Sequence, residues 1–131
     1  MKKDGILNSD LSEVIASLGH KDMLVVSDAG FPIPRDVRRI DLAVRQGLPG
    51  FLEMIEAIAD ELEVEKIIIA EEMLEKSPQM KEDLDEIFDG AAFKAIAHAE
   101  LKELSKEAAA VVRTGEFTPY ANVILVSGVV F

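Results

Sequence analysis

The stretch VEKIIIA, residues 64–70, decides the fold of this chain, because it is the strongest strand signal in the sequence. Its β-branched apolar residues form a short continuous run, which is typical of a strand buried on both faces of a sheet. Working outward from it, similar runs occur toward both ends of the chain. The sequence predicts strands at 23–27, 37–42, 64–70, 93–97, 109–113 and 123–130.

Amphipathic segments occupy the gaps between these predicted strands. Apolar residues at helical spacing predict helices at about 9–18, 51–62, 71–76, 78–88 and 98–107. Because strands and helices alternate, we expect an α/β fold with three layers, α/β/α, around a mixed, largely parallel central sheet. The short turn before the last strand predicts an antiparallel element there. No linker interrupts the pattern, so we expect a single domain over residues 1–131.

The composition excludes several classes of function. Of the 131 residues, 25 are acidic and 14 are basic, and the net charge of −11 argues against nucleic acid or a membrane surface as partner. The absence of cysteine excludes disulfides, thiolate nucleophiles and cysteine-ligated metals, while two histidines could at most anchor a mixed His/carboxylate metal site. Nucleotide-binding glycine loops and the nucleophile-elbow motif are also missing. With no signal-peptide core and no apolar window near ~20 residues, we expect a cytoplasmic location.

Two polar residues in the first part of the chain are candidates for a site. His20 follows a helix stop, so it either satisfies the terminal helix carbonyls or acts as a general acid and base near neutral pH. Asp28 follows the strand 23–27, where α/β sheets bind ligands. It is either a turn former or a carboxylate that binds a ligand hydroxyl or orients His20.

Two later segments hold further candidates. His98 follows the predicted strand 93–97, and Lys102 lies one turn further on the same helix face, although by its own pattern Lys102 is better explained as a surface lysine. Tyr120 and Asn122 lie in a turn just before the last strand. They either pack at the strand entrance or stack against a polyol and hydrogen-bond to it.

Five stretches carry a resemblance to a known family: GILNSDLSEVIASLGHKD (5–22), DAGFPIP (28–34), RIDLAVRQGLPGF (39–51), VEKIIIAEE (64–72) and VVRTGEFTPYANVILVSGVVF (111–131). The most specific part is RTGEFTPYAN, residues 113–122. In these stretches, which run nearly from end to end, the chain resembles the D-ribose pyranase family. It is similar, more distantly, to the fucose mutarotases of the same superfamily.

This resemblance implies an activity, the interconversion of the β-pyranose and β-furanose forms of D-ribose by acid/base ring opening and closure. It implies His20 as the catalytic residue, with no metal and no cofactor. The sugar-binding residues that it implies are Asp28, His98, Lys102, Tyr120, Ala121 and Asn122. It also implies a homo-oligomer, a decamer of stacked rings, with the sites at subunit boundaries and with neither nucleic acid nor membrane as partner.

Two other functions stay open at this point. One is a fucose-type mutarotase acting on another monosaccharide. The other is a non-catalytic sugar-binding partner of ribose uptake, which would need Asp28, Tyr120 and Asn122 but not His20. A nucleotide-binding module is disfavoured, because no glycine-rich loop follows the first strand. The apolar end VILVSGVVF (123–131) is buried either in a neighbouring subunit or in the chain's own sheet.

Overall fold

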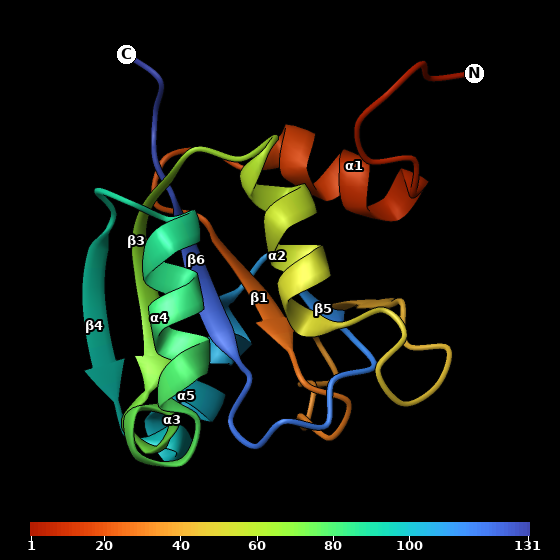
Figure 1. The fold of residues 1–131 in the computed structure, drawn as a ribbon. Coiled ribbons are helices and arrows are strands. Elements are labelled where there is room, and N and C mark those ends of the chain that lie inside the picture. The colour runs from red at the N-terminus through yellow and green to blue at the C-terminus, as the bar shows by residue number, and fades with distance from the viewer.

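One six-stranded sheet runs through the molecule, with helices on both of its faces (Figure 1). The computed structural model describes residues 1–131. The strands are β1 (Met23–Ser27), β2 (Arg38–Asp41), β3 (Val64–Ala70), β4 (Ala92–Ile96), β5 (Ala110–Arg113) and β6 (Val123–Ser127). The helices are α1 (Ser9–Ser17), α2 (Phe51–Ala59), α3 (Glu71–Lys76), α4 (Pro78–Ile87) and α5 (His98–Leu104), which continues into the short 3₁₀-helix η1 (Ser105–Glu107).

The strand order is β2-β5-β1-β6-β3-β4, and β6 is the one strand that runs against the others. The pairs β2–β5, β5–β1 and β3–β4 are all parallel. The prediction of a mixed, largely parallel sheet between helical layers is therefore confirmed. The predicted antiparallel element is also present, but β6 pairs with β1 and β3 rather than with β5, its predecessor in sequence.

Alternation along the strands sends their side chains into two apolar layers. On one face, Leu24, Ile67 and Leu125 pack with residues of α1, α2 and α4, including the fully buried Phe51 and Leu84. Figure 1 shows α2 and α4 lying across this face. On the other face Val25, Ile68 and Ile124 pack with Leu101 of α5 and with Phe31 from the loop after β1. Burial of each large side chain contributes roughly 1.5–3 kcal/mol, so the double layer holds the strand ends in fixed places.

The two apolar runs 23–27 and 64–70 form strands with the predicted bounds, but the last strand is shorter than expected. It ends at Ser127, because strand pairing ends there: Met23 pairs with Val126, Val64 pairs with Ser127, and beyond them only the Gly128 N–H donates to the Glu63 carbonyl. The three residues after Gly128 are exposed, and Phe131 is 100% exposed. The apolar C-terminus is thus not buried in the chain's own sheet, and it projects beyond the helices in Figure 1.

Candidate active site

The carboxyl edge of the parallel strands collects most of the predicted site residues. Asp28 follows β1 directly and His98 follows β4 across the single residue Ala97. Because β6 is antiparallel, its beginning lies at the same edge, and this brings the segment from Tyr120 to Asn122 beside them. Three separate parts of the sequence therefore meet at one end of the sheet, where open α/β sheets bind ligands.

Asp28 and Asn122 form the fixed centre of this cluster. The Asn122 amide donates to Asp28 Oδ2 at 2.8 Å, and its carbonyl oxygen accepts the backbone N–H of Asp28 at 2.9 Å. The other carboxylate oxygen of Asp28 accepts the N–H of Gly30 at 2.9 Å, which is the turn-forming contact that the sequence suggested. Asn122 is fully buried and Asp28 is partly exposed, so both carboxylate oxygens are oriented by the chain while the residue stays open to solvent.

His98 presents its ring edge-on to two aromatic side chains. The ring centroids lie 5.1 Å from Tyr120 at 87° and 6.3 Å from Phe31 at 77°. The His98 backbone N–H donates to the carboxylate of Glu72 at 3.0 Å, which anchors the beginning of α5. Its Nδ1 atom is buried without any hydrogen-bond partner. Such an atom needs a partner, and a hydroxyl of a bound molecule would satisfy it.

The pKa of His98 lies below its ordinary value. Desolvation by burial is the main cause, and the positive charge of Lys102 one turn away on α5 adds to it. The nearby carboxylates of Glu72 and Asp28 act in the opposite direction. At neutral pH the His98 imidazole is therefore uncharged, and one of its nitrogens is a hydrogen-bond acceptor.

The backbone at Tyr120 is strained into the left-handed region, with φ of 61°. A tyrosine rarely adopts this conformation, and such residues are concentrated where function requires them. A 2.8 Å hydrogen bond from the Asn122 N–H to the Tyr120 carbonyl closes the turn around the buried Ala121. The turn aims Tyr120 at His98 and Asn122 at Asp28, so a single feature orients two of the predicted site residues.

The segment before this turn, residues 113–119, adds residues that were not among the predicted site residues. Arg113 forms an ion pair with Asp41 at 3.0 Å and donates through Nε to the carbonyl of Ala29. Thr114 bonds through its hydroxyl to the Ser27 carbonyl at 2.7 Å. At Gly115 any Cβ would lie 2.7–2.8 Å from backbone atoms of Leu48, so only glycine fits. Arg113, Thr114 and Gly115 thus connect loops that are far apart in the sequence. Such contacts leave no local pattern, so the sequence indicated these three residues only through the family resemblance.

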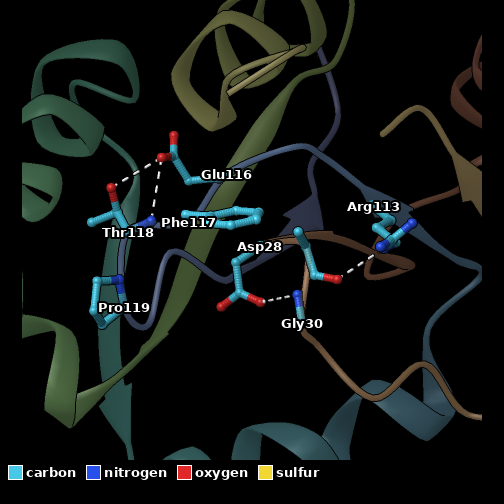
Figure 2. A pocket seen from close by; sticks show the side chains of 8 residues that line it. Asp28, Gly30, Arg113, Glu116, Phe117, Thr118 and Pro119 are labelled. Atoms are coloured by element: carbon cyan, nitrogen blue, oxygen red, sulfur yellow. Dashed lines mark hydrogen bonds between the residues drawn. The ribbon is translucent and has the colours of Figure 1, made fainter. Parts of the chain in front are cut away.

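A hollow of about 430 Å³ opens between this segment and the end of β1. Figure 2 shows Asp28, Phe117 and the Glu116–Thr118 pair around it, with Arg113 bonded to Ala29 at its far side. The Asp28 carboxylate is the one predicted site residue on its wall. The hollow is thus continuous with the cluster through Asp28, and it is of a size suited to a small polar molecule.

Glu116 holds this wall in place. Its Oε1 accepts the N–H of Phe51 at the beginning of α2 at 3.1 Å, and its Oε2 accepts the hydroxyl of Thr118 at 3.0 Å. Desolvation works to raise the pKa of Glu116, but the hydrogen bonds from Phe51, Thr118 and the neighbouring backbone outweigh it and lower the pKa. The carboxylate therefore stays ionised and connects the segment 113–119 to the first turn of α2.

His20 lies at the opposite edge of the sheet. It precedes β1, whose five residues, at about 3.3 Å per residue, separate it from Asp28 by roughly 16 Å. Its Nε2 is 2.8 Å from Oε2 of Glu65 at the beginning of β3. Within one chain, therefore, Asp28 does not orient His20, and His20 does not bond to helix carbonyls either. Glu65 is its partner, and no local pattern in the sequence signals this contact across 45 positions.

The described residues hold no group of three or more histidine, aspartate or glutamate side chains placed to bind a metal ion. No helix is both long enough and apolar enough to span a lipid bilayer. The polar groups that the two edges of the sheet offer include two imidazoles, carboxylates, an amide, a phenol and the cations of Lys21 and Arg113.

Comparison with known proteins gives matches over the full chain. A D-ribose pyranase of Chloroflexus aggregans is 55% identical over 131 residues, and one of Symbiobacterium thermophilum is 52% identical, with 100% of each chain covered. The structure of Bacillus subtilis RbsD complexed with D-ribose superposes with a TM-score of 0.96 at 46% identity, covering 100% of both chains. FucU from Bifidobacterium longum follows with a TM-score of 0.79 at 25% identity, covering 95% and 96%.

A match to a protein-family model agrees with these similarities. The model described as the RbsD / FucU transport protein family matches residues 1–130. The match includes both edges of the sheet, with His20 and Glu65 at one and Asp28, His98 and Asn122 at the other. This chain belongs to the RbsD / FucU transport protein family.

Proposed function

We propose that this chain is a D-ribose pyranase, an intramolecular isomerase that interconverts the β-pyranose and β-furanose forms of D-ribose. The observation that carries the proposal is identity of 52–55% over the whole chain to proteins named D-ribose pyranase. The 46% identical structure, solved with D-ribose, supports the same sugar. We also propose that residues 1–131 act as one domain in this reaction.

The reaction moves protons but needs no net gain or loss of them. A base takes the proton from the anomeric hydroxyl, the bond from C1 to the ring oxygen breaks, and that oxygen is protonated to give the open aldehyde. In the closing step a different hydroxyl oxygen attacks C1, loses its proton, and the carbonyl oxygen takes one up. An imidazole suits both steps, because its ordinary pKa lies close to neutral pH.

In this scheme His20 is the acid and base, and the opposite edge of the sheet binds the sugar. Asp28, held by Asn122 and Gly30, accepts hydrogen bonds from hydroxyls through the remaining lone pairs of its carboxylate. The orphaned Nδ1 of neutral His98 bonds another hydroxyl, and Tyr120 offers a flat ring beside it. Ala121 contributes backbone groups, and Lys102 lies within reach of the His98 end of the site. No cofactor is assigned a part in these steps.

The proposed site requires a homo-oligomer. Since His20 and the sugar-binding cluster lie at opposite edges of one chain, they meet only if the edge of one subunit faces the other edge of its neighbour. The exposed apolar residues at 129–131 leave the sheet at the His20 edge and suit burial against such a neighbour. We propose a decamer of stacked rings. The cytoplasmic location stays a prediction.

The decisive experiment is NMR saturation transfer on equilibrated D-ribose with and without the protein. We expect the protein to speed exchange between pyranose and furanose signals. Binding of ribose without faster exchange would instead favour a sugar-binding partner of ribose uptake. Faster exchange between L-fucose anomers, with ribose unchanged, would favour the fucose-type mutarotase. Fucose is the less supported substrate, because FucU is only 25% identical.

A further inference from the structure

Glu65 contacts the imidazole of His20 directly, and this contact decides which ring nitrogen is free. His20 Nε2 lies 2.8 Å from Glu65 Oε2, whereas His20 Nδ1 has no hydrogen-bond partner within the chain. An ionised carboxylate only accepts hydrogen bonds. The nitrogen that faces Glu65 must therefore carry a proton, including in the neutral imidazole, and Nδ1 is left with its lone pair.

The backbone of β3 is shaped to make this contact. The register with β6 shifts by one residue between Val64 and Lys66, so Glu65 is the extra residue of a β-bulge. Bulges change the direction of a side chain and are frequent beside functional sites. Gly128 lies against the bulge, and a Cβ there would be 3.1 Å from Glu65 Cβ. The bulge and the glycine together give Glu65 a defined direction.

A second partner, the Lys21 ammonium, keeps Glu65 ionised. The Lys21 ammonium forms an ion pair with Oε1, the oxygen that His20 leaves free. Lys21 has a φ of 75°, and its N–H donates to the Ser127 carbonyl at 2.9 Å. Hydrogen bonds from Lys21, and then from His20, lower the pKa of Glu65. The carboxylate is accordingly charged throughout the neutral range, and the strained loop places the Lys21 ammonium and the His20 imidazole on either side of it.

We infer that Glu65 is a positioning residue, which keeps the proton of neutral His20 on Nε2 and makes Nδ1 the nitrogen that exchanges protons with the sugar. This inference rests on the proposed function for the identity of the reaction. The orientation of the proton rests only on the contacts of Glu65. Glu65 itself does not touch the sugar in this scheme, so it affects turnover and not affinity.

The variant Glu65→Gln tests whether Glu65 sets the His20 tautomer, because it changes the hydrogen-bonding groups of the side chain and leaves its shape nearly unchanged. Lys21 has only donors, so the amide oxygen of the substituted side chain turns toward it and the amide NH₂ faces His20. An NH₂ group needs an acceptor, and Nε2 then becomes the unprotonated nitrogen. The proton of the neutral ring moves to Nδ1, which is the wrong tautomer for a base at that atom. Glu63→Gln is the matched control, because Glu63 is exposed at the same edge and its side chain makes no contact with His20.

The readout is the pair of imidazole ¹⁵N chemical shifts of His20, measured above neutral pH in the oligomeric protein. The chain has only two histidines, so His20→Ala assigns the spectrum. We expect a protonated Nε2 in the unaltered protein and in Glu63→Gln, and a protonated Nδ1 in Glu65→Gln. In saturation transfer, kcat for ribose should fall about tenfold or more in Glu65→Gln with KM unchanged.

The possible results distinguish failure of this inference from failure of the proposed function. A proton on Nδ1 in the unaltered protein, or no change of tautomer in Glu65→Gln, overturns the inference. So does an unchanged kcat in Glu65→Gln when the unaltered protein is active on ribose. If the unaltered protein does not speed ribose exchange at all, the proposed function fails instead, and the ¹⁵N shifts still decide whether Glu65 sets the proton of His20.

Discussion

Asn122 and Asp28 exchange two hydrogen bonds, one to the Asp28 backbone N–H at 2.9 Å and one to its carboxylate at 2.8 Å. The two residues are 94 positions apart, and Asn122 is fully buried. A single amide therefore fixes both the position of the loop after β1 and the direction of the proposed sugar-binding carboxylate. This double role makes Asn122 the most sensitive residue of the cluster.

We predict that Asn122→Ala lowers both stability and activity. The part-buried N–H of Asp28 loses its acceptor, which costs about 1–3 kcal/mol in the free energy of unfolding measured by urea denaturation. The carboxylate is no longer oriented, and a displacement of about 1 Å reduces ribose exchange by about 10²-fold.

Asn8→Ala is the matched control for this prediction. Asn8 also uses its side-chain oxygen to accept a backbone N–H, that of Leu11 at the beginning of α1. Its loss costs about 1 kcal/mol of stability and should leave ribose exchange unchanged. Equal losses of activity in the two variants would mean that Asn122 acts through stability alone.

Acid should weaken the contact between the segment 113–119 and α2, because protonation of Glu116 weakens its hydrogen bond from the Phe51 N–H. The pKa of Glu116 is lower in the folded chain than its ordinary value of 4.5, so its stabilising contribution is complete above about pH 4.5. The contribution is lost as the pH falls through the lower, folded-state pKa. In Glu116→Gln we expect about 1–2 kcal/mol less stability at pH 7, since hydrogen bonds to a charged acceptor are lost.

The pH dependence distinguishes this explanation from a general loss of packing. Urea midpoints of the unaltered protein and of Glu116→Gln should converge as the pH falls through the lowered, folded-state pKa of Glu116, because below it both proteins have an uncharged side chain at residue 116. A constant difference between the two proteins from pH 7 to pH 3 would contradict the proposed role of the charge.

Lys102 should control the charge of His98. Burial is the main cause of the low pKa of His98 and the charge of Lys102 is the second, so Lys102→Met should raise this pKa without reaching the ordinary value. An NMR titration of the His98 ring measures the change. The free energy of unfolding should depend on pH for the same reason. Because the pKa of His98 is lowered in the folded chain, the contribution of neutral His98 is complete above about pH 6.5 and is lost as the pH falls through the folded-state pKa.

Lys106→Met is the control for this titration. Lys106 lies one further turn along the chain and pairs with Glu103 on the surface at 2.7 Å. It does not contribute to the pKa of His98, so the titration curve should stay in place. If Lys102→Met also leaves the curve in place, the uncharged state of His98 comes from burial alone.

The sequence predicted the bounds of the strands better than it predicted their order in the sheet. Periodicity gave the bounds of β1 and β3, because each strand is buried on both faces and its apolar run has sharp ends. It did not give the insertion of β6 between them, since strand order depends on packing of the whole sheet. It also overextended the last strand to residue 130, where no partner strand exists.

For the site, the sequence pointed to residue types and to one edge of the sheet, and four candidate side chains do meet there: Asp28, His98, Tyr120 and Asn122. What it did not reveal are the residues that act through others. Glu65 reaches His20 only because of a bulge, and Glu116 reaches α2 across 65 positions. Such contacts leave no local pattern, because they depend on loops being brought together by the core.

The separation of His20 from Asp28 gives a last prediction, subunit complementation. His20→Ala alone should reduce ribose exchange by about 10²–10⁴-fold while its stability stays within about 0.5 kcal/mol, since this side chain is 48% exposed. Asp28→Asn should also be nearly inactive. If each site takes His20 from one subunit and Asp28 from the next, random mixed oligomers of the two variants contain intact sites at about one in four positions.

We therefore expect co-refolded His20→Ala and Asp28→Asn chains to recover about a quarter of the unaltered activity. The control mixture combines Asp28→Asn with Asn122→Ala. These residues lie in the same cluster of the same chain, so every site in that mixture stays defective and activity does not return. Native mass spectrometry must show mixed oligomers in both samples. Mixed oligomers of the first pair without recovered activity would contradict a site shared between subunits, because complementation needs only that the two edges come from different chains.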